Sequence, residues 1–253
     1  MKVTLLGTGT SFGVPVIGCD CEVCRSTDSK DKRFRCAALL ETDTTRILID
    51  AGPDIRQQLL PQPFRSIDAV LITHKHYDHV GGLDDLRPFS YIHPLAIYAN
   101  ADTCKSIRRQ LPYCFPDQHY PGAPTFELHP VERGAELSIG DIRVDVLEVM
   151  HGALPILAFR VGAFAYITDM KSIAPAEEAR LRGVKTLVVN ALRFNHPHAT
   201  HQLTNDAIDF SRRIGAEQTF FIHMTHDIGF HHEANKKLPD GFAFAFDCQQ
   251  ISI

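Results

Sequence analysis

The feature that most constrains this chain is an apolar stretch that runs directly into a cluster of histidines. Residues 69–73 are apolar and partly β-branched, which is typical of a buried strand, and the sequence HKHYDHVGG follows at once. On an extended backbone the side chains of His74 and His76 point the same way. Asp78 and His79 lie beyond a bend, so their side chains can face a second metal position close to the first. Three imidazoles and one carboxylate between a strand and a glycine turn therefore indicate a site for two metals rather than a polar loop that happens to contain histidines.

The bulk properties of the sequence fit a globular protein of a reducing compartment. The 253 residues suit one large domain, residues 1–253, and 44% hydrophobic residues can form a sizeable core. A net charge of −4 gives no electrostatic footprint for nucleic acid, and no apolar run approaches the roughly 20 residues that span a bilayer. Residues 1–7 read as a strand that enters a glycine turn, not as a signal peptide. We therefore expect a cytoplasmic protein whose seven cysteines are reduced or bound to metal.

Three cysteines follow the first predicted strand at a spacing that is typical of a metal site. Cys19, Cys21 and Cys24 form a C-x-C-x-x-C pattern, which in a reducing compartment favours a metal knuckle over a disulfide framework. A tetrahedral metal needs a fourth ligand, and the pattern leaves both Cys36 and a distant histidine open as candidates. The alternative is a set of three cysteines without a metal.

Three more side chains with metal-binding chemistry come at the ends of predicted strands. His151, Asp169 and His223 each follow an apolar or alternating run. The sequence predicts strands at 2–6, 37–42, 46–50, 69–73, 95–98, 126–131, 136–139, 142–149, 156–161, 164–168, 186–190, 218–222, 242–246 and 249–253. It predicts helices at 54–60, 83–91, 103–111, 203–214 and 231–237, and a short one from 175. Asp102 is a candidate N-cap for the helix at 103–111.

The histidine stretch and these later side chains resemble the signature of the metallo-β-lactamase superfamily. The resemblance implies an α/β fold (α+β by some schemes), which is a four-layer αββα sandwich of two mixed β-sheets with a metal site at one edge. It also implies that Asp50 supports the metal loop from behind without binding metal. The implied ligands are His74, His76 and His151 for the first metal, Asp78, His79 and His223 for the second, and Asp169 as a bridge. Nitrogen and oxygen ligands suit Zn²⁺, with Mn²⁺ or Fe as alternatives.

The chemistry that this resemblance implies is metal-dependent hydrolysis. Two metals about 3.5–4 Å apart lower the pKa of a shared water, which yields a bridging hydroxide, and they clamp the oxygens of the substrate. Asp78 therefore counts among the catalytic residues as well as among the ligands. The arrangement suits a phosphodiester, but it could equally cleave a lactam, a thioester or a lactone. The metals alone do not identify the substrate.

A second histidine pair narrows the resemblance to one family. His223 and His226 are three residues apart, so one ring can face the catalytic metals while the other turns to a different site. This pair, the cysteine run and the tail sequence LPDGF resemble the PhnP family of phosphodiesterases, which act on a phosphoribosyl cyclic phosphate in phosphonate use. The resemblance spans essentially the whole chain. It implies a structural zinc held by Cys19, Cys21, Cys24 and His226.

One further catalytic residue is implied by the same family. His201 matches a histidine that PhnP proteins and the tRNA 3′-processing nucleases place opposite the metals, where it stabilises the phosphate or protonates the leaving oxygen. Arg193, His196 and His198 share its loop and are candidates for phosphate binding, although a solvated loop explains them equally well. The chain departs from the family pattern around residues 190–193 and 112–124, so the identity of the substrate stays open.

Several functions are compatible with these residues. The first is a phosphodiesterase acting on a small cyclic phosphate or a nucleotide-type phosphodiester. A tRNA 3′-end endonuclease is an alternative, but the glycine-rich basic arm that such enzymes usually carry is not visible. A thioester or lactone hydrolase is another, and an inactive scaffold is opposed by the complete ligand set. We expect two catalytic divalent metals, one structural zinc and a small phosphodiester as partner, with nucleic acid not favoured, no membrane and a homodimer left open.

Overall fold

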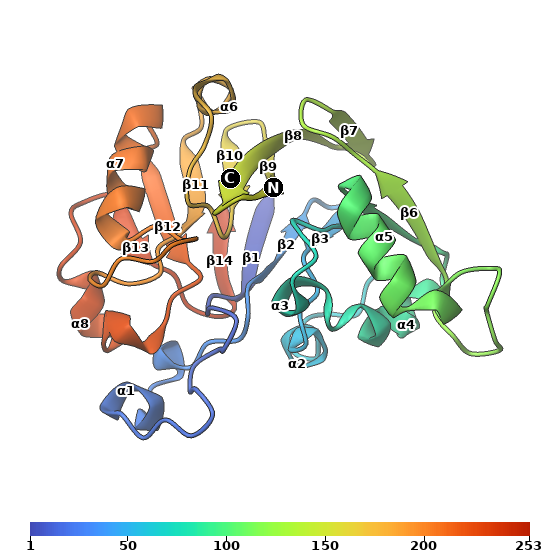
Figure 1. Cartoon of the computed structure of the whole chain (residues 1–253), viewed down its shortest axis with the longest axis horizontal. Coiled ribbons are helices and arrows are strands. Elements are labelled where there is room, and N and C mark those ends of the chain that lie inside the picture. The colour runs from blue at the N-terminus through green and yellow to red at the C-terminus, as the bar shows by residue number, and fades with distance from the viewer.

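Two seven-stranded mixed sheets make up the centre of the protein (Figure 1). The computed structural model describes residues 1–253. The first sheet has the order β14-β1-β2-β3-β4-β5-β6, so its outermost strand beside β1 comes from the far end of the chain. Its strands are β1 Lys2–Gly7, β2 Ala37–Glu41, β3 Arg46–Ile49, β4 Ala69–Leu71, β5 Leu95–Ala99, β6 Phe126–Pro130 and β14 Gln249–Ser252. Pairing is antiparallel from β14 to β3 and parallel from β3 to β6.

The second sheet repeats this plan with the order β13-β12-β11-β10-β9-β8-β7. Its strands are β7 Glu136–Ile139, β8 Ile142–His151, β9 Leu154–Val161, β10 Phe164–Ile167, β11 Thr186–Asn190, β12 Gln218–Ile222 and β13 Phe242–Phe244. Strands β7 to β10 pair antiparallel, whereas β10 to β13 pair in parallel. Because parallel strands end at the same edge of a sheet, the residues after β10 and β12 lie on one side of the molecule.

Helices connect the strands of both sheets. The α-helices are α1 Glu22–Arg25, α2 Ile55–Leu59, α3 Tyr77–Val80, α4 Arg87–Ser90, α5 Ala101–Gln110, α6 Pro175–Ala179, α7 Thr204–Ile214 and α8 His231–Asn235. The 3₁₀ helices are η1 Ser29–Asp31, η2 Leu83–Leu86, η3 Pro112–Cys114 and η4 His226–Ile228. None of these helices combines the length and the apolar character that crossing a membrane would require.

The apolar core forms three layers, which correspond to the three interfaces of an αββα sandwich. The middle layer lies between the sheets and contains side chains such as Leu40 and Phe159. A second layer packs the outer face of the first sheet, including Leu48, against helices that include α5. The third packs the outer face of the second sheet against helices that include α7, through Phe210 among others. The predicted four-layer sandwich of two mixed sheets is therefore confirmed.

The strands appear where the sequence predicts them, but two predictions about helices are wrong. The helix predicted at 83–91 is divided into η2 and α4, with Pro88 in the first turn of α4. Asp102 is not the cap of α5, because Asn100 lies at that position and its Oδ1 accepts the N–H of Thr103 at 2.8 Å. Asp102 instead accepts a 2.6 Å hydrogen bond from Lys75 Nζ, which ties the histidine stretch to α5.

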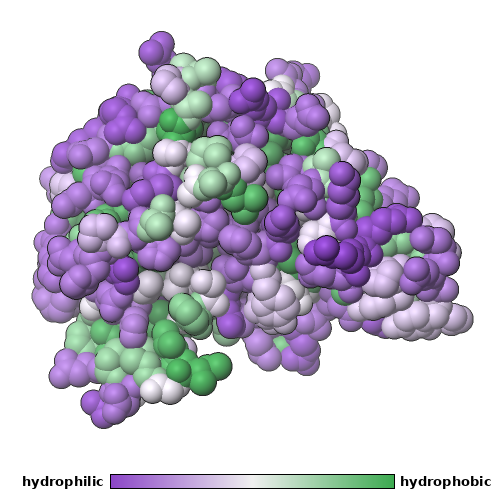
Figure 2. All heavy atoms as spheres, in the orientation of Figure 1, coloured by the Kyte–Doolittle hydropathy of each residue, from purple (hydrophilic) through white to green (hydrophobic).

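The segment around α1 stands apart from the three core layers. In Figure 2 the most extensive apolar surface on this face lies at the lower left, where Figure 1 shows α1. Ile17, which lies just before α1, is 97% exposed. A segment this short buries too little apolar surface to fold on its own, so another interaction has to hold it in place.

Candidate metal centre

The predicted catalytic ligands meet where strand ends from the two sheets approach one another. The first sheet contributes the segment after β4, and the second contributes the ends of β8, β10 and β12. Their ligand atoms form two groups, each within 4.8 Å, and a third group that overlaps both adds His201 to His151 and Asp169. Of the first two groups, one contains His74, His76 and His151, and the other contains Asp78, His79, Asp169 and His223. The structure thus brings all seven residues together in the two groups that the resemblance implies.

Asp169 lies between the two groups and faces both. Its Oδ2 is 3.2 Å from His223 Nε2 and its Oδ1 is 3.5 Å from His79 Nε2, on the side of the second group. The same Oδ2 is 3.9 Å from His74 Nε2, which belongs to the first group. A carboxylate in this position can share its oxygens between two cations.

Two donor atoms of the centre lack hydrogen-bond partners and are suited to binding a metal. The Nε2 atoms of His79 and His223 are buried and have no hydrogen-bond partner in the protein. An orphaned buried nitrogen is costly unless a ligand satisfies it. Imidazole and carboxylate donors suit Zn²⁺ and related divalent ions. The residues present therefore fit the metals that the fold implies.

Neighbouring groups fix which ring nitrogen faces the centre. His79 donates from Nδ1 to Asp50 Oδ2 at 2.7 Å, and the Thr73 N–H donates to Asp50 Oδ1 at 2.8 Å. His151 donates from Nδ1 to the Thr200 carbonyl at 3.0 Å. In both rings Nε2 is then left as a lone pair for a metal, which is the usual role of such outer partners. Asp50 lies behind the loop in the way that the family resemblance implies.

Three of these residues adopt a left-handed backbone conformation that non-glycine residues rarely use. Asp50, Asp169 and His223 have φ values of 59°, 54° and 58°. Such a conformation costs on the order of 1–3 kcal/mol per residue and persists where the surrounding structure enforces it, often at functional sites. Each of the three follows a strand of the sandwich, so the strained turns lie where the strands end beside the centre.

Electrostatics of the metal-free centre favour cations. Burial alone would raise the pKa of the Asp169 carboxyl, but His223 and His79 hold that pKa well below its usual range. Burial and the neighbouring His79 lower the pKa of His74, so its ring is neutral and able to bind metal. Burial would also lower the pKa of His223, yet Asp169 raises it to about 9. The carboxylates that raise this pKa would equally favour a bound cation.

His201 lies beside the metal ligands, where the resemblance implies a catalytic residue. Its Nε2 is 3.3 Å from Asp169 Oδ2, and its ring stacks on that of His223 with centroids 4.8 Å apart. Of the three loop residues that the sequence offered as candidates for phosphate binding, His198 contacts His201, with ring centroids 4.9 Å apart. Arg193 and His196, the other candidates in this loop, are directed elsewhere: Arg193 pairs with Asp227 at 3.1 Å, and His196 is exposed.

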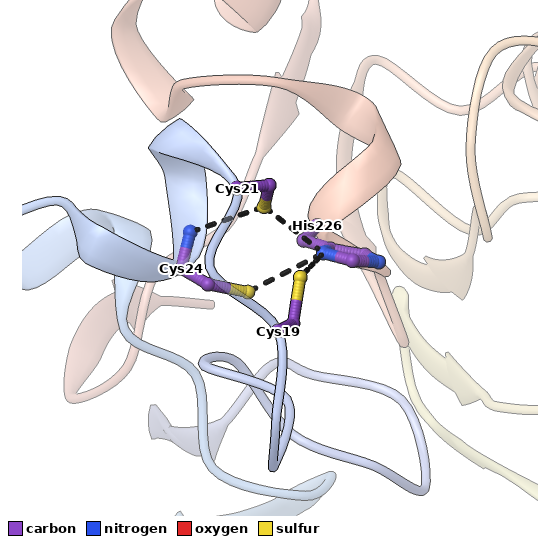
Figure 3. Close-up of side chains that lie close together, drawn as sticks. All are labelled: Cys19, Cys21, Cys24 and His226. Carbon is purple, nitrogen blue, oxygen red and sulfur yellow. Dashed lines mark hydrogen bonds between the residues drawn. The ribbon is translucent and has the colours of Figure 1, made fainter.

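The three knuckle cysteines converge on a histidine from the other end of the chain (Figure 3). The Nδ1 of His226 lies 3.4 Å from Cys19 Sγ and 3.3 Å from both Cys21 Sγ and Cys24 Sγ. Cys36 lies elsewhere, because it is buried and its thiol donates to the Gly9 carbonyl at 3.3 Å. Of the two candidates for the fourth position, the structure brings His226 to the cluster.

The environment of one cysteine of the knuckle favours its deprotonated, thiolate form. The Cys24 N–H donates to Cys21 Sγ at 3.4 Å. This hydrogen bond lowers the pKa of the Cys21 thiol to about 6 against the opposing effect of burial. The thiolate is the form that binds metal, so the ring of donors in Figure 3 suits zinc.

A sandwich of two mixed sheets that carries these imidazoles and carboxylates at one edge defines the metallo-β-lactamase class of fold. The profile of the beta-lactamase superfamily domain matches residues 45–224. A solved structure described as a new diphosphatase from the PhnP family has a TM-score of 0.92 and 36% identity, and the match covers 100% of this chain and 97% of that one. The chain therefore belongs to the beta-lactamase superfamily and, within it, to the PhnP family.

Two other similar proteins carry different names. An octanoyltransferase of Porphyromonas gingivalis is 44% identical over 98% of this chain, although the match covers only 50% of that protein. The chain thus spans about half the length of the curated relatives it matches. The Zn²⁺-bound PqqB of Methylobacterium extorquens matches with a TM-score of 0.79 over 100% of both chains, and at 19% identity this likeness shows a shared fold alone.

Proposed function

We propose that this protein is a metal-dependent hydrolase, and specifically a phosphodiesterase that acts on a small cyclic phosphate or a nucleotide-type phosphodiester. The observation that carries the proposal is the shared position of Asp169, which faces both groups of metal ligands and also His201. A diphosphatase from the PhnP family, 36% identical to this chain, supports a phosphate substrate.

The residues of the chain have separate roles in this proposal. One metal would be held by His74, His76 and His151 and the other by Asp78, His79 and His223, and Asp169, which faces both groups, would contribute to both. When bound, the metals lower the pKa of a water and neutralise charge on the phosphate. His201 presents Nε2 to the reacting phosphate and gives a proton to the leaving oxygen. Burial lowers the pKa of His201 to about 4, and an anionic phosphate beside the ring would raise it again.

The knuckle has a structural role in the same proposal. A zinc held by Cys19, Cys21, Cys24 and His226 joins the exposed α1 segment to the strand end that carries His223. Since His226 is three residues from His223, this zinc would also hold His223 at its position in the catalytic centre. The proposal places the reaction in the cytoplasm, where thiols stay reduced.

A panel of substrates tests the activity itself. We expect hydrolysis of bis(p-nitrophenyl) phosphate, of a ribose cyclic phosphate or of a diphosphate ester to exceed that of octanoyl thioester, a lactone and nitrocefin. A chelator should abolish this activity, and Zn²⁺ or Mn²⁺ should restore it. Faster cleavage of the thioester would favour the acyl chemistry suggested by the name of the octanoyltransferase relative. Metal-loaded protein that turns over no member of the panel, nor a tRNA precursor, would contradict the enzymatic assignment.

The role of His201 gives a sharper test. His201→Ala should lower turnover by roughly 10²–10⁴-fold, which is the usual contribution of a positioned acid or base. The metal content should stay unchanged, because the seven ligands remain. An aryl leaving group needs little proton donation, so the loss should be smaller with p-nitrophenyl esters than with alkyl esters.

A matched control is His232→Ala, which alters a histidine whose side chain is 74% exposed. This variant should keep full activity. Equal losses for aryl and alkyl esters in His201→Ala would assign the residue to phosphate binding rather than to proton donation. Full activity in His201→Ala would remove it from the site.

A further inference from the structure

The loop that carries His201 brings a second imidazole into contact with it. His198 Nδ1 lies 3.0 Å from His201 Nδ1, and His198 is only partly buried. The loop is held by hydrogen bonds on both sides of His198. Arg193 Nε donates to the His196 carbonyl at 3.0 Å, and the Thr200 carbonyl accepts the 3.0 Å hydrogen bond from His151. The contact between the two rings thus belongs to a fixed segment.

The hydrogen bonds around these rings determine where the shared proton lies. Two facing ring nitrogens at 3.0 Å can share one proton, because two lone pairs or two N–H groups would repel. The backbone N–H of Thr200 also donates to His198 Nδ1, at 3.3 Å. His198 Nδ1 is therefore an acceptor, and the proton between the rings belongs to His201 Nδ1.

The consequence concerns the opposite nitrogen of His201. With its proton on Nδ1, a neutral His201 ring has a lone pair on Nε2, and a charged ring has an N–H there. This nitrogen lies 3.3 Å from Asp169 Oδ2, and because a carboxylate only accepts, the contact requires the charged ring, which donates from Nε2 to Asp169 and from Nδ1 to His198. The ring can accept or release a proton at Nε2 without rotating.

We propose that His198 is a positioning residue, which accepts the Nδ1–H of His201 and so keeps Nε2, the nitrogen that gives up its proton, directed at the substrate. This proposal rests on the phosphodiesterase function proposed above. His198 touches no reacting atom and acts through His201, as the outer partner of a catalytic histidine does. Thr200 Oγ1, 3.1 Å from His201 Nδ1, is a weaker substitute acceptor.

Amide side chains of two lengths test the position of the acceptor. The amide oxygen of His198→Asn can occupy the place of Nδ1, whereas the longer His198→Gln places its amide near that of Nε2. We expect His198→Ala and His198→Gln to lower kcat for an alkyl phosphodiester by about 10–100-fold, and His198→Asn to keep most of it. KM and metal content should change little in all three.

A double-mutant cycle separates action through His201 from a general effect on the loop. In a His201→Ala background, His198→Ala should cause no further loss. His196→Asn is the matched control, because His196 is exposed and has a φ of 63°, a conformation that asparagine tolerates. The proposal is overturned if His198→Ala costs as much in the His201→Ala background, or if His196→Asn lowers kcat as much as His198→Ala.

The tautomer can also be measured without any substrate. In ¹⁵N-labelled, Zn²⁺-loaded protein, His201 should show a protected Nδ1–H signal that persists in His198→Asn and is lost to exchange in His198→Gln. A His201 ring protonated on Nε2 alone would overturn the proposal. The expected signal in a protein that cleaves no phosphodiester would instead contradict the proposed function and leave the positioning role standing.

Discussion

Replacing Asp169 by asparagine is expected to abolish most of the activity and to lower the metal content of the catalytic centre. Protein purified without chelator should contain about two metals at this centre in addition to one in the knuckle. Asp169 faces both groups of ligands, so its loss weakens both metals at once. The activity should fall by more than about 10²-fold, since even outer partners of metal ligands are worth about 10–100-fold. Metal analysis and turnover on the same samples check the result.

The matched control for this change is Asp209→Asn on α7, whose carboxylate is exposed and lies outside the centre. It should leave both metal content and turnover as they are. A folded Asp169→Asn protein that keeps two catalytic metals and full turnover would contradict the bridging role. Wild-type protein that never holds more than one metal in total would contradict the dinuclear centre itself.

Loss of one knuckle ligand should reduce stability first and activity second. Cys21→Ser and His226→Ala should each remove one zinc per chain, because three donors remain where zinc requires four. Metal binding contributes directly to folding, and each kcal/mol lost lowers the melting temperature of a chain of this size by roughly 2–4 °C. Activity should fall less than in Asp169→Asn, since the catalytic ligands are only displaced through His223.

Two cysteines outside the cluster provide controls for this prediction. Cys248→Ser alters an exposed cysteine and should change neither zinc content nor melting temperature. Cys36→Ser should retain all the zinc, because Cys36 lies away from the other thiols. A zinc count that falls in Cys36→Ser but not in His226→Ala would identify Cys36 as the fourth ligand. Wild-type zinc content and melting temperature in both Cys21→Ser and His226→Ala would leave the knuckle as free cysteines.

The two candidate metal sites are connected through the chain. His226 belongs to η4, which begins directly after the strand end that carries His223 and Met224. The N–H of Thr10 donates to the Met224 carbonyl at 3.0 Å, so the glycine-rich first loop is hydrogen-bonded to the same segment. Disturbing the knuckle therefore reaches the catalytic centre through His223, which explains why stability should respond before turnover.

The sequence alone determined the strands and the positions of most ligands. Residues 69–73 and the other apolar runs predict their strands because side-chain alternation and β-branching act within a few residues. His74, His76, Asp78 and His79 are also a local pattern, and their resemblance to a known signature pointed to the ligands downstream. The sandwich itself was implied by that resemblance, and the fourteen predicted strands match the strands of the two sheets.

Only the tertiary structure decided the features that depend on contacts between distant segments. The structure places His226, and not Cys36, beside the three cysteines. Cys24 and His226 are 202 positions apart in the chain, so no local sequence pattern predicts that their side chains meet. The helix begins at Ala101, directly after the strand that ends at Ala99, so Asn100 rather than Asp102 is its cap. The contact between His198 and His201 likewise depends on how their loop folds over the centre. Spacing along a chain fixes which side chains can share a face of one element, whereas the hydrogen bonds and tautomers of a site depend on which elements pack together.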